Sequence, residues 1–159
     1  MPTRNLTTLI AGCLAVLYLV SSTHAAFYFI QSQLNTALVL TVNGTELGAH
    51  YTMQYKNDTN DLQKFEFLAN ENIRCKGSNL VIDIEGGGYT GSALVQTSPS
   101  TSDTQKWHVK GNEIFSRKSH IPDLVMDIRD KNPNPGAVVQ VWIEKNTDDD
   151  NQEWNLVAA

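Results

Sequence analysis

Three residues of the types found in hydrolytic triads lie close together in the sequence. Ser116, His120 and Asp123 could serve as nucleophile, base and orienting acid. Such triads are defined by geometry in the folded protein, and closeness along the chain does not produce that geometry. His50, His108 and His120 also lack the spacing of metal ligands. Because nothing else places a nucleophile against a base, we predict a protein that is not an enzyme, with no metal ion and no cofactor.

Two short runs resemble ion-binding loops. The glycines of Gly86–Gly88 could approach a phosphate, but no Lys-Ser or Lys-Thr pair follows them, as a phosphate loop requires. The acidic run Asp148–Asp150 lacks the glycine and the spaced glutamate of a calcium loop. We interpret the acidic run as a solvated turn.

Composition narrows the class of protein further. The chain has 159 residues, of which 41% are hydrophobic and 18% charged, so it fits one compact domain. Lys and Arg total 12 against 17 Asp and Glu, which gives a formal net charge of −5. No run of basic residues is present, and binding to nucleic acid or to an anionic membrane requires one. We therefore expect neither partner.

The N-terminal segment has the pattern of a secretory signal peptide. Arg4 precedes an uncharged apolar stretch over Leu6–Val20, and Thr23 and Ala25 are small residues at a cleavage position. The sequence predicts removal of residues 1–25 and secretion of a single domain over 26–159, with no membrane span in the mature form. The alternative is an uncleaved signal anchor, although the apolar stretch is short for a span.

Cleavage would remove Cys13 and leave Cys75 as the remaining cysteine. The mature chain could then form no internal disulfide, and we expect Cys75 to be buried or, alternatively, to pair with another chain. Two glycosylation sequons begin at Asn43 and Asn57, which predicts that both lie in surface loops.

The rest of the chain is a threefold repeat, which decides the architecture. Each repeat opens with a short apolar run and ends with Gln, any residue, and Trp or Phe. The opening runs are Leu38–Val42, Leu80–Ile84 and Leu124–Ile128, and the closing glutamines are Gln63, Gln105 and Gln152. A further glutamine follows the fourth position of each opening run by 13 residues, at Gln54, Gln96 and Gln140. We expect these three glutamines to be equivalent.

The local pattern is that of an all-β protein. Short runs of Val, Ile and Leu alternate with turn residues, and no stretch keeps a helical period. Three copies of four strands around a pseudo-threefold axis would close a barrel without exposed edges. Phe65, Trp107 and Trp154 occupy equivalent positions, so we predict that they form a shared aromatic layer in the core.

Three repeats that end in Gln-x-Trp or Gln-x-Phe resemble the ricin B-chain-type β-trefoil lectins. The resemblance implies a β-trefoil with repeats over about 27–70, 71–112 and 113–159. The sequence departs from the family in its cysteines, because Val125 and Glu144 stand about where many members have a disulfide within the repeat. The fold would then depend on packing alone.

The resemblance also implies a sugar site in the third repeat. A pyranose needs an aromatic face for its C–H groups, a carboxylate to accept from hydroxyls and an amide to donate. By resemblance, Asp127 would accept from adjacent hydroxyls, Trp142 would stack on the ring and Asn151 would donate. Gln140 and Gln152 would be supporting amides in the same carbohydrate-binding site.

The other two repeats match this pattern less well. The second keeps Asp83, but Ser98 and Thr104 stand at its aromatic and amide positions, so it would be at most a degenerate site. The first has lost all three groups and is expected to be structural; its residues there are Thr41, Lys56 and Leu62.

Each proposed site residue also has a structural interpretation. Asp127 could bond backbone amides in a turn, and Trp142 could belong to the core. Gln140 and Gln152 could bond the backbone as scaffold.

Two hypotheses for function therefore stand. The first is a secreted lectin for galactose or N-acetylgalactosamine-type glycans, with one weak site in the third repeat and avidity from a homo-oligomer. The second is a secreted β-trefoil that interacts with proteins, as an inhibitor, a cytokine-like ligand or a toxin-associated subunit, without binding sugar. Free galactose would displace the partner of the first and not of the second.

Overall fold

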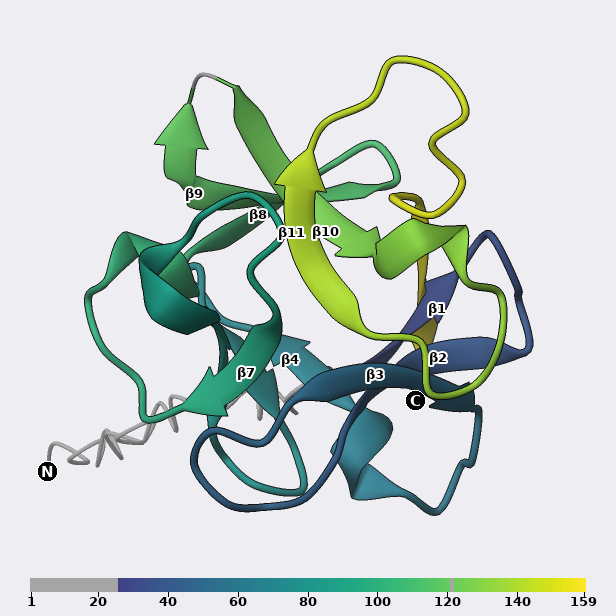
Figure 1. Cartoon of the computed structure of the whole chain (residues 1–159). Coiled ribbons are helices and arrows are strands. Elements are labelled where there is room, and N and C mark those ends of the chain that lie inside the picture. Colours follow the sequence, from purple (N-terminus) through teal and green to yellow (C-terminus); the bar gives the residue numbers. More distant parts are fainter. Residues whose placement is uncertain (1–25, 121) are drawn as a thin grey trace, which may run out of the picture.

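The computed structural model describes residues 26–120 and 122–159. The predicted signal peptide lies outside the described residues. Twelve strands and four short 3₁₀ helices make up the described part (Figure 1). The strands are β1 (Tyr28–Ser32), β2 (Leu38–Val42), β3 (Tyr51–Tyr55), β4 (Phe65–Phe67), β5 (Ile73–Cys75), β6 (Val81–Ile84), β7 (Leu94–Thr97), β8 (Trp107–Lys110), β9 (Glu113–His120), β10 (Asp123–Ile128), β11 (Val139–Ile143) and β12 (Trp154–Ala158). The 3₁₀ helices are η1 (Asp61–Gln63), η2 (Glu85–Gly87), η3 (Asp103–Gln105) and η4 (Arg129–Lys131).

The strands fall four to each repeat, and the first and last strands lie in one wall. β1 pairs antiparallel with β12 along its whole length, from Tyr28 opposite Ala158 to Ser32 opposite Trp154. β1 also contacts β4, and β4 pairs with β5. This pairing of the first strand with the last closes the wall, so each of the two strands has a partner along its whole length (Figure 1).

The hairpin of each repeat leans on the next repeat in a cyclic order. Single β-bridges join His50 to Val95, Ala93 to Gln140, and Val138 to Thr52. Each bridge joins one hairpin to that of the next repeat, and the third returns to the first. The strand pairing and these bridges together define a closed pseudo-threefold arrangement.

The pairing register corrects the expected equivalence of three glutamines. Asp127 pairs with Gln140, but the corresponding partners of Thr41 and Asp83 are Thr52 and Val95. Gln54 and Gln96 are therefore not equivalent to Gln140, although all three share the same spacing along the chain. The cause is the length of the connection between the paired strands, which is longest in the third repeat.

Gln96 has a different role from the one that its spacing predicted. Its side-chain amide donates to the backbone oxygens of Gly44 and Glu46 at 3.0 and 2.8 Å, and its Oε1 accepts from Ser78. It is fully buried. Gln96 thus fixes the β2–β3 loop of the first repeat against the second.

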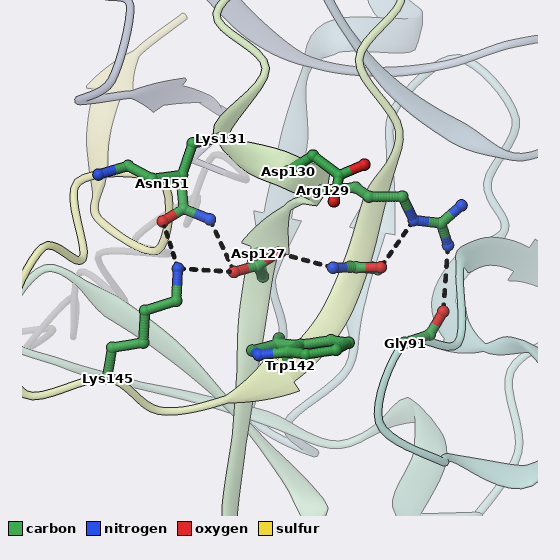
Figure 2. Close-up of a pocket in the computed structure, with 9 residues that line it drawn as sticks. Gly91, Asp127, Arg129, Asp130, Lys131, Trp142, Lys145 and Asn151 are labelled. Carbon is green, nitrogen blue, oxygen red and sulfur yellow. Dashed lines mark hydrogen bonds and ion pairs between the residues drawn. The ribbon is translucent and has the colours of Figure 1, made fainter.

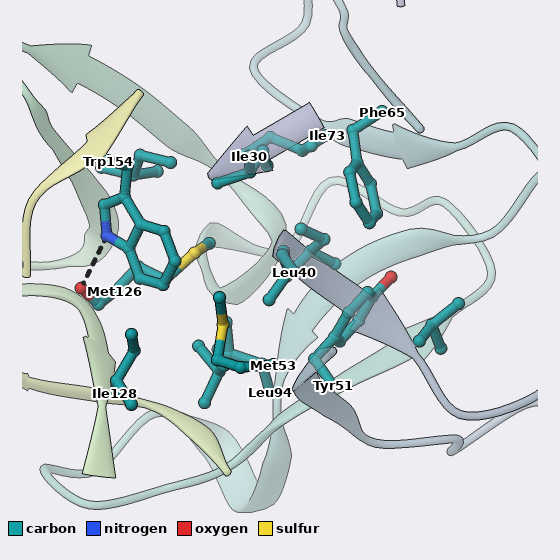
Figure 3. Packing of buried hydrophobic residues seen from close by; sticks show 14 of the residues in the cluster. Ile30, Leu40, Tyr51, Met53, Phe65, Ile73, Leu94, Met126, Ile128 and Trp154 are labelled. Carbon is teal, nitrogen blue, oxygen red and sulfur yellow. Dashed lines mark hydrogen bonds between the residues drawn. The ribbon is translucent and has the colours of Figure 1, made fainter. Parts of the chain in front are cut away.

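The predicted aromatic layer is confirmed. Phe65, Trp107 and Trp154 are all buried, each as the first residue of its strand, among aliphatic side chains from the three repeats (Figure 3). The two indoles donate to the backbone oxygens of Ile82 and Met126 at 3.1 and 3.2 Å. Burial of these large rings stabilises the junction of the repeats without any disulfide.

Cys75 is a free thiol and is buried, as one of the two alternatives predicted.

Within residues 26–120 and 122–159, no helix has the length and apolar character needed to span a membrane.

Candidate functional site

A cleft of about 430 Å³ opens on the third repeat. β10 supplies Asp127 to it, β11 supplies Gln140 and Trp142, and the β11–β12 loop supplies Lys145 and Asn151 (Figure 2). The η4 turn forms the opposite rim, and Gly91 enters from the second repeat. Four of the five residues predicted for the site, all but Gln152, therefore line one cleft.

Asp127 lies at the back of the cleft and is only 2% exposed. Its Oδ1 accepts one bond, from Gln140 at 2.9 Å, whereas its Oδ2 accepts from Asn151 and Gln152 at 2.8 and 2.9 Å. Burial raises the pKa of Asp127 above its usual value, although these amide bonds and the nearby Lys145 act to lower it. Oδ1 keeps one lone pair that can accept a further hydrogen bond.

Asn151 and Gln152 hold this carboxylate. Both amide hydrogens of Asn151 are used, one on Asp127 and one on the backbone oxygen of Ile128. Those of Gln152 are likewise used, on Asp127 and on the oxygen of Ile143. Neither amide has a hydrogen left for a ligand in this arrangement, so the donor that the sequence assigned to Asn151 must come from elsewhere.

Gln140 is oriented by a cation. Its Oε1 accepts from Nε of Arg129 at 2.7 Å, which directs its nitrogen toward Asp127. A side-chain amide nitrogen carries two hydrogens, so Gln140 keeps one for a ligand. Arg129 was not predicted from the sequence, because its role depends on a contact across the hairpin.

Lys145 is a second donor that the sequence did not indicate. Its ammonium group donates to Oδ1 of Asn151 at 2.8 Å and lies 3.8 Å from Oδ2 of Asp127. An ammonium has three hydrogens, so further donors remain for a ligand. The backbone N–H of Lys145 donates to the closing glutamine, and Asn57 and Ser100 make the same bond in the other two repeats. Because neither of these equivalent residues is basic, the repeat pattern gave little indication of a lysine in the site.

Trp142 is the apolar floor of the cleft. Its side chain is 40% exposed, and its ring lies beneath the acid and amide groups (Figure 2). A buried, core role for this indole is therefore wrong. One edge of the ring lies against Gly91, where an added Cβ would be 3.4 Å from the ring.

The second repeat contains an acid without a cleft-forming aromatic. Asp83 accepts from the Thr97 hydroxyl at 2.8 Å and from Gln105 at 2.9 Å, and also from the backbone N–H of Ile84. The register places Thr97, rather than Ser98, at the position of Trp142. The hydroxyl of this threonine thus binds the carboxylate that a sugar would need.

The first repeat has no acid at this position. Thr41 accepts from Gln63 at 3.0 Å and donates to the backbone oxygen of Val39. Gln54, rather than Lys56, corresponds to Trp142. This arrangement is structural, as the sequence predicted.

The closing glutamines repeat one set of bonds. In each repeat the side-chain oxygen of the closing glutamine accepts from a backbone N–H. Its side-chain nitrogen donates to the backbone oxygen of the residue two positions before that N–H. The same nitrogen also donates to the side chain at the position of Asp127. The backbone oxygens belong to Tyr55, Ser98 and Ile143. The structural interpretation of these glutamines is therefore correct, with Gln152 adding support for Asp127.

The acidic run beside the cleft is neutralised by a lysine. Lys131 bonds Asp148 and also lies 2.7 Å from Asp150. Hydrogen bonding to these two acids raises the pKa of Lys131, and the bond from Lys131 lowers that of Asp148. In the described part of the chain, no group of three or more His, Cys, Asp and Glu side chains could hold a metal ion.

Both predicted glycosylation sites, Asn43 and Asn57, are exposed in loops.

The closed barrel of three four-stranded repeats defines a β-trefoil. The chain belongs to the family of ricin-type β-trefoil lectin domains, whose sequence profile matches residues 26–154. Because this is a family of lectins, membership supports carbohydrate binding in general. It also supports the conclusion that this domain is not itself an enzyme. No curated protein shows a significant sequence match to the chain.

Solved structures with the same fold are distant in sequence. The C-terminal half of an earthworm R-type lectin, in complex with GalNAc, is 23% identical with a TM-score of 0.71, over 84% of this chain and 99% of that chain. The β-trefoil lectin of the Vibrio vulnificus hemolysin/cytolysin, with N-acetyl-D-lactosamine bound, is 19% identical with a TM-score of 0.70, over 86% and 96%. An exo-β-1,3-galactanase from Clostridium thermocellum is 19% identical with a TM-score of 0.74, over 86% of this chain but 31% of the enzyme. At these identities the similarity establishes the fold alone.

Proposed function

We propose that this protein is a secreted, non-enzymatic lectin that binds a terminal galactose or N-acetylgalactosamine residue in the third-repeat cleft. One observation carries the proposal: an exposed indole lies beneath a carboxylate and unused N–H donors. The sugar ring has an apolar face that suits Trp142 and a rim of hydroxyls that suits Asp127. The preference for galactose is supported by the two similar lectin structures, which hold GalNAc and N-acetyl-D-lactosamine.

We propose a role for each residue that fits its hydrogen bonds. Asp127 accepts a sugar hydroxyl at the free lone pair of Oδ1. Gln140 and Lys145 donate, in place of the expected donor Asn151. Asn151 and Gln152 keep the carboxylate in position, because each spends its amide hydrogens on Asp127 and on the backbone.

Trp142→Ala tests this assignment directly. Because the indole is exposed, its loss should leave the fold intact and abolish binding on a glycan array of the secreted protein. Asp127→Asn should weaken binding strongly and leave only a residual signal. Two amide donors converge on the Oδ2 position, so the oxygen of the asparagine would lie there, and the nitrogen at the Oδ1 position cannot accept from a sugar hydroxyl.

Asp83→Ala is the matched control, because it removes the equivalent acid of the second repeat, where no aromatic platform stands. It should bind as the wild type does. Equal array signals from wild type and Trp142→Ala would contradict the proposed site.

The strength of binding has a consequence for assembly. One shallow sugar site typically gives affinity around the millimolar level, or about −4 kcal/mol. We infer that useful binding at a glycan-covered surface comes from several copies acting together, as a homo-oligomer.

A further inference from the structure

The cleft of the third repeat is completed by a loop of the second. This loop, residues 86–92, connects β6 to β7 and is bonded to β11 through the backbone. Gly91 donates to the oxygen of Val141 at 2.8 Å, and Val141 donates to the oxygen of Ser92 at 2.9 Å. Ala93 then forms its bridge with Gln140. The loop is therefore fixed beside the strand that carries the sugar platform.

Side-chain contacts strengthen the same junction. Arg129, which orients Gln140, also donates to the oxygen of Gly91 at 3.1 Å (Figure 2). Gly91 has a φ of 87° and lies against the ring edge of Trp142, so a side chain is disfavoured there. The backbone of the loop thus borders the platform with nothing between them.

Tyr89 stands at the start of the turn that ends beside Trp142. The N–H of Ser92 donates to the oxygen of Tyr89 at 2.9 Å, which closes a β-turn over residues 89–92. The Cα of Tyr89 is consequently within about 7 Å of the Cα of Gly91. Tyr89 is 75% exposed, more than any other large hydrophobic residue in the described part of the chain.

The aromatic residue occurs only at the turn that borders the complete cleft. The same turn closes in the other repeats, where Ala49 donates to Glu46 and Ala137 donates to Asn134. Tyr89 therefore corresponds to Glu46 and Asn134, which offer no apolar face. Tyr89 thus differs from other exposed hydrophobic residues in its place, because it offers an aromatic face at the turn that borders the cleft.

We propose that Tyr89 forms a second subsite, which contacts the sugar residue linked to the one held over Trp142. This inference rests on the proposed function. The phenol ring provides a face for C–H groups and a hydroxyl for hydrogen bonds. Because the rings of a disaccharide are joined through one oxygen, the second ring lies beside the first and can reach the turn. The backbone bonds of Gly91 and Ser92 fix the end of the turn before binding, so little backbone ordering is required there.

Calorimetric titration of the full secreted protein tests the subsite. The ligands are methyl β-galactoside and two disaccharides in which galactose is linked β1,3 or β1,4 to N-acetylglucosamine. Wild type should bind at least one disaccharide several-fold more tightly than the monosaccharide. Tyr89→Ala should bind the monosaccharide unchanged and lose that several-fold gain.

Tyr55→Ala is the matched control, since Tyr55 is also exposed (63%) but lies at the end of β3 in the first repeat. It should behave as wild type with every ligand. A disaccharide gain that survives in Tyr89→Ala, or a wild type without any gain, overturns the subsite and leaves the proposed function in place. Failure of wild type to bind any of the three sugars overturns both the subsite and the proposed binding of terminal galactose.

Discussion

At the scale of single residues, the cleft depends on how fully each polar atom is already bonded. Asp127 is buried, but three side-chain amides compensate for the loss of water around it. The bonds are unevenly distributed, with two on Oδ2 and one on Oδ1. This asymmetry leaves one acceptor position on Oδ1, which the proposed ligand would use.

The same asymmetry predicts a dependence of sugar binding on pH. Burial raises the pKa of Asp127 above 3.8, so a proton is taken up at a higher pH than in an ordinary aspartate. Oδ1 has the unused lone pair, so that proton would occupy the position a sugar hydroxyl needs. Affinity should therefore fall as the pH is lowered through this raised pKa.

Calorimetric titration over the acid range measures this fall, with circular dichroism to show that the protein stays folded. The residual binding of Asp127→Asn should not change over the same range. An affinity that stays constant until the pH reaches 3.8 would argue against this role for the acid.

At the scale of the elements, the site is a junction between two hairpins. β10 and β11 place the acid and the platform, and the β6–β7 loop covers one edge of the platform. Arg129 bonds both parts, through Gln140 of β11 and Gly91 of the loop. The proposed sugar site is therefore a product of the contact between repeats as much as of the third repeat.

Arg129→Met should weaken sugar binding several-fold. The substitution keeps an apolar stem but removes the donor that orients the Gln140 amide, so this amide can rotate away from Asp127. Loss of hydrogen bonds from a charged group should also lower the free energy of unfolding by about 1.5–3 kcal/mol. Sugar titration and urea denaturation measure the two effects.

Arg74→Met is the control, because Arg74 pairs with Glu66 near the surface, between β4 and β5. It should leave sugar binding unchanged and cost at most about 1 kcal/mol. Wild-type affinity in Arg129→Met would show that the Gln140 amide does not need this cation.

At the scale of the whole molecule, stability comes from closure and from the shared core. The first and last strands pair along their full length, and the three aromatic residues that begin β4, β8 and β12 belong to one buried cluster with side chains of every repeat. Figure 3 shows Phe65 and Trp154 in this cluster. No repeat buries its apolar face alone, so unfolding of one should expose the others. We expect a single cooperative transition.

Trp107→Ala tests this dependence of each repeat on the others. Removal of a buried indole should lower the free energy of unfolding by about 3–5 kcal/mol, with one transition in urea. Trp107 lies in the second repeat and is not part of the cleft, so the folded variant should keep its sugar affinity.

Val109→Ala, on the same strand but exposed, is the comparison and should lie within about 0.5 kcal/mol of wild type. A Trp107→Ala protein with two separate transitions would show that the repeats unfold independently.

The sequence by itself determined the architecture and most of the site. The core positions of three aromatic residues could be predicted because each of them follows a closing glutamine; they are Phe65, Trp107 and Trp154. Each closing glutamine bonds backbone groups that lie within nine residues of it in the same repeat. Such bonds are local, so the glutamine and the aromatic residue that follows it leave a pattern that can be recognised along the chain. The resemblance to ricin-type lectins also selected Asp127, Trp142 and the amides around the acid, but it left open whether the indole is exposed, and the structure shows that it is.

Only the tertiary structure decided the pairing register, the free donors and the wall of the cleft. Gln54, Gln96 and Gln140 share a spacing but not a position, because hairpin loops of different length bring different residues opposite the acid. Arg129 and Gly91 meet across 38 residues and two repeats. A sequence pattern records distance along the chain, whereas hydrogen bonds between repeats depend on distance in space.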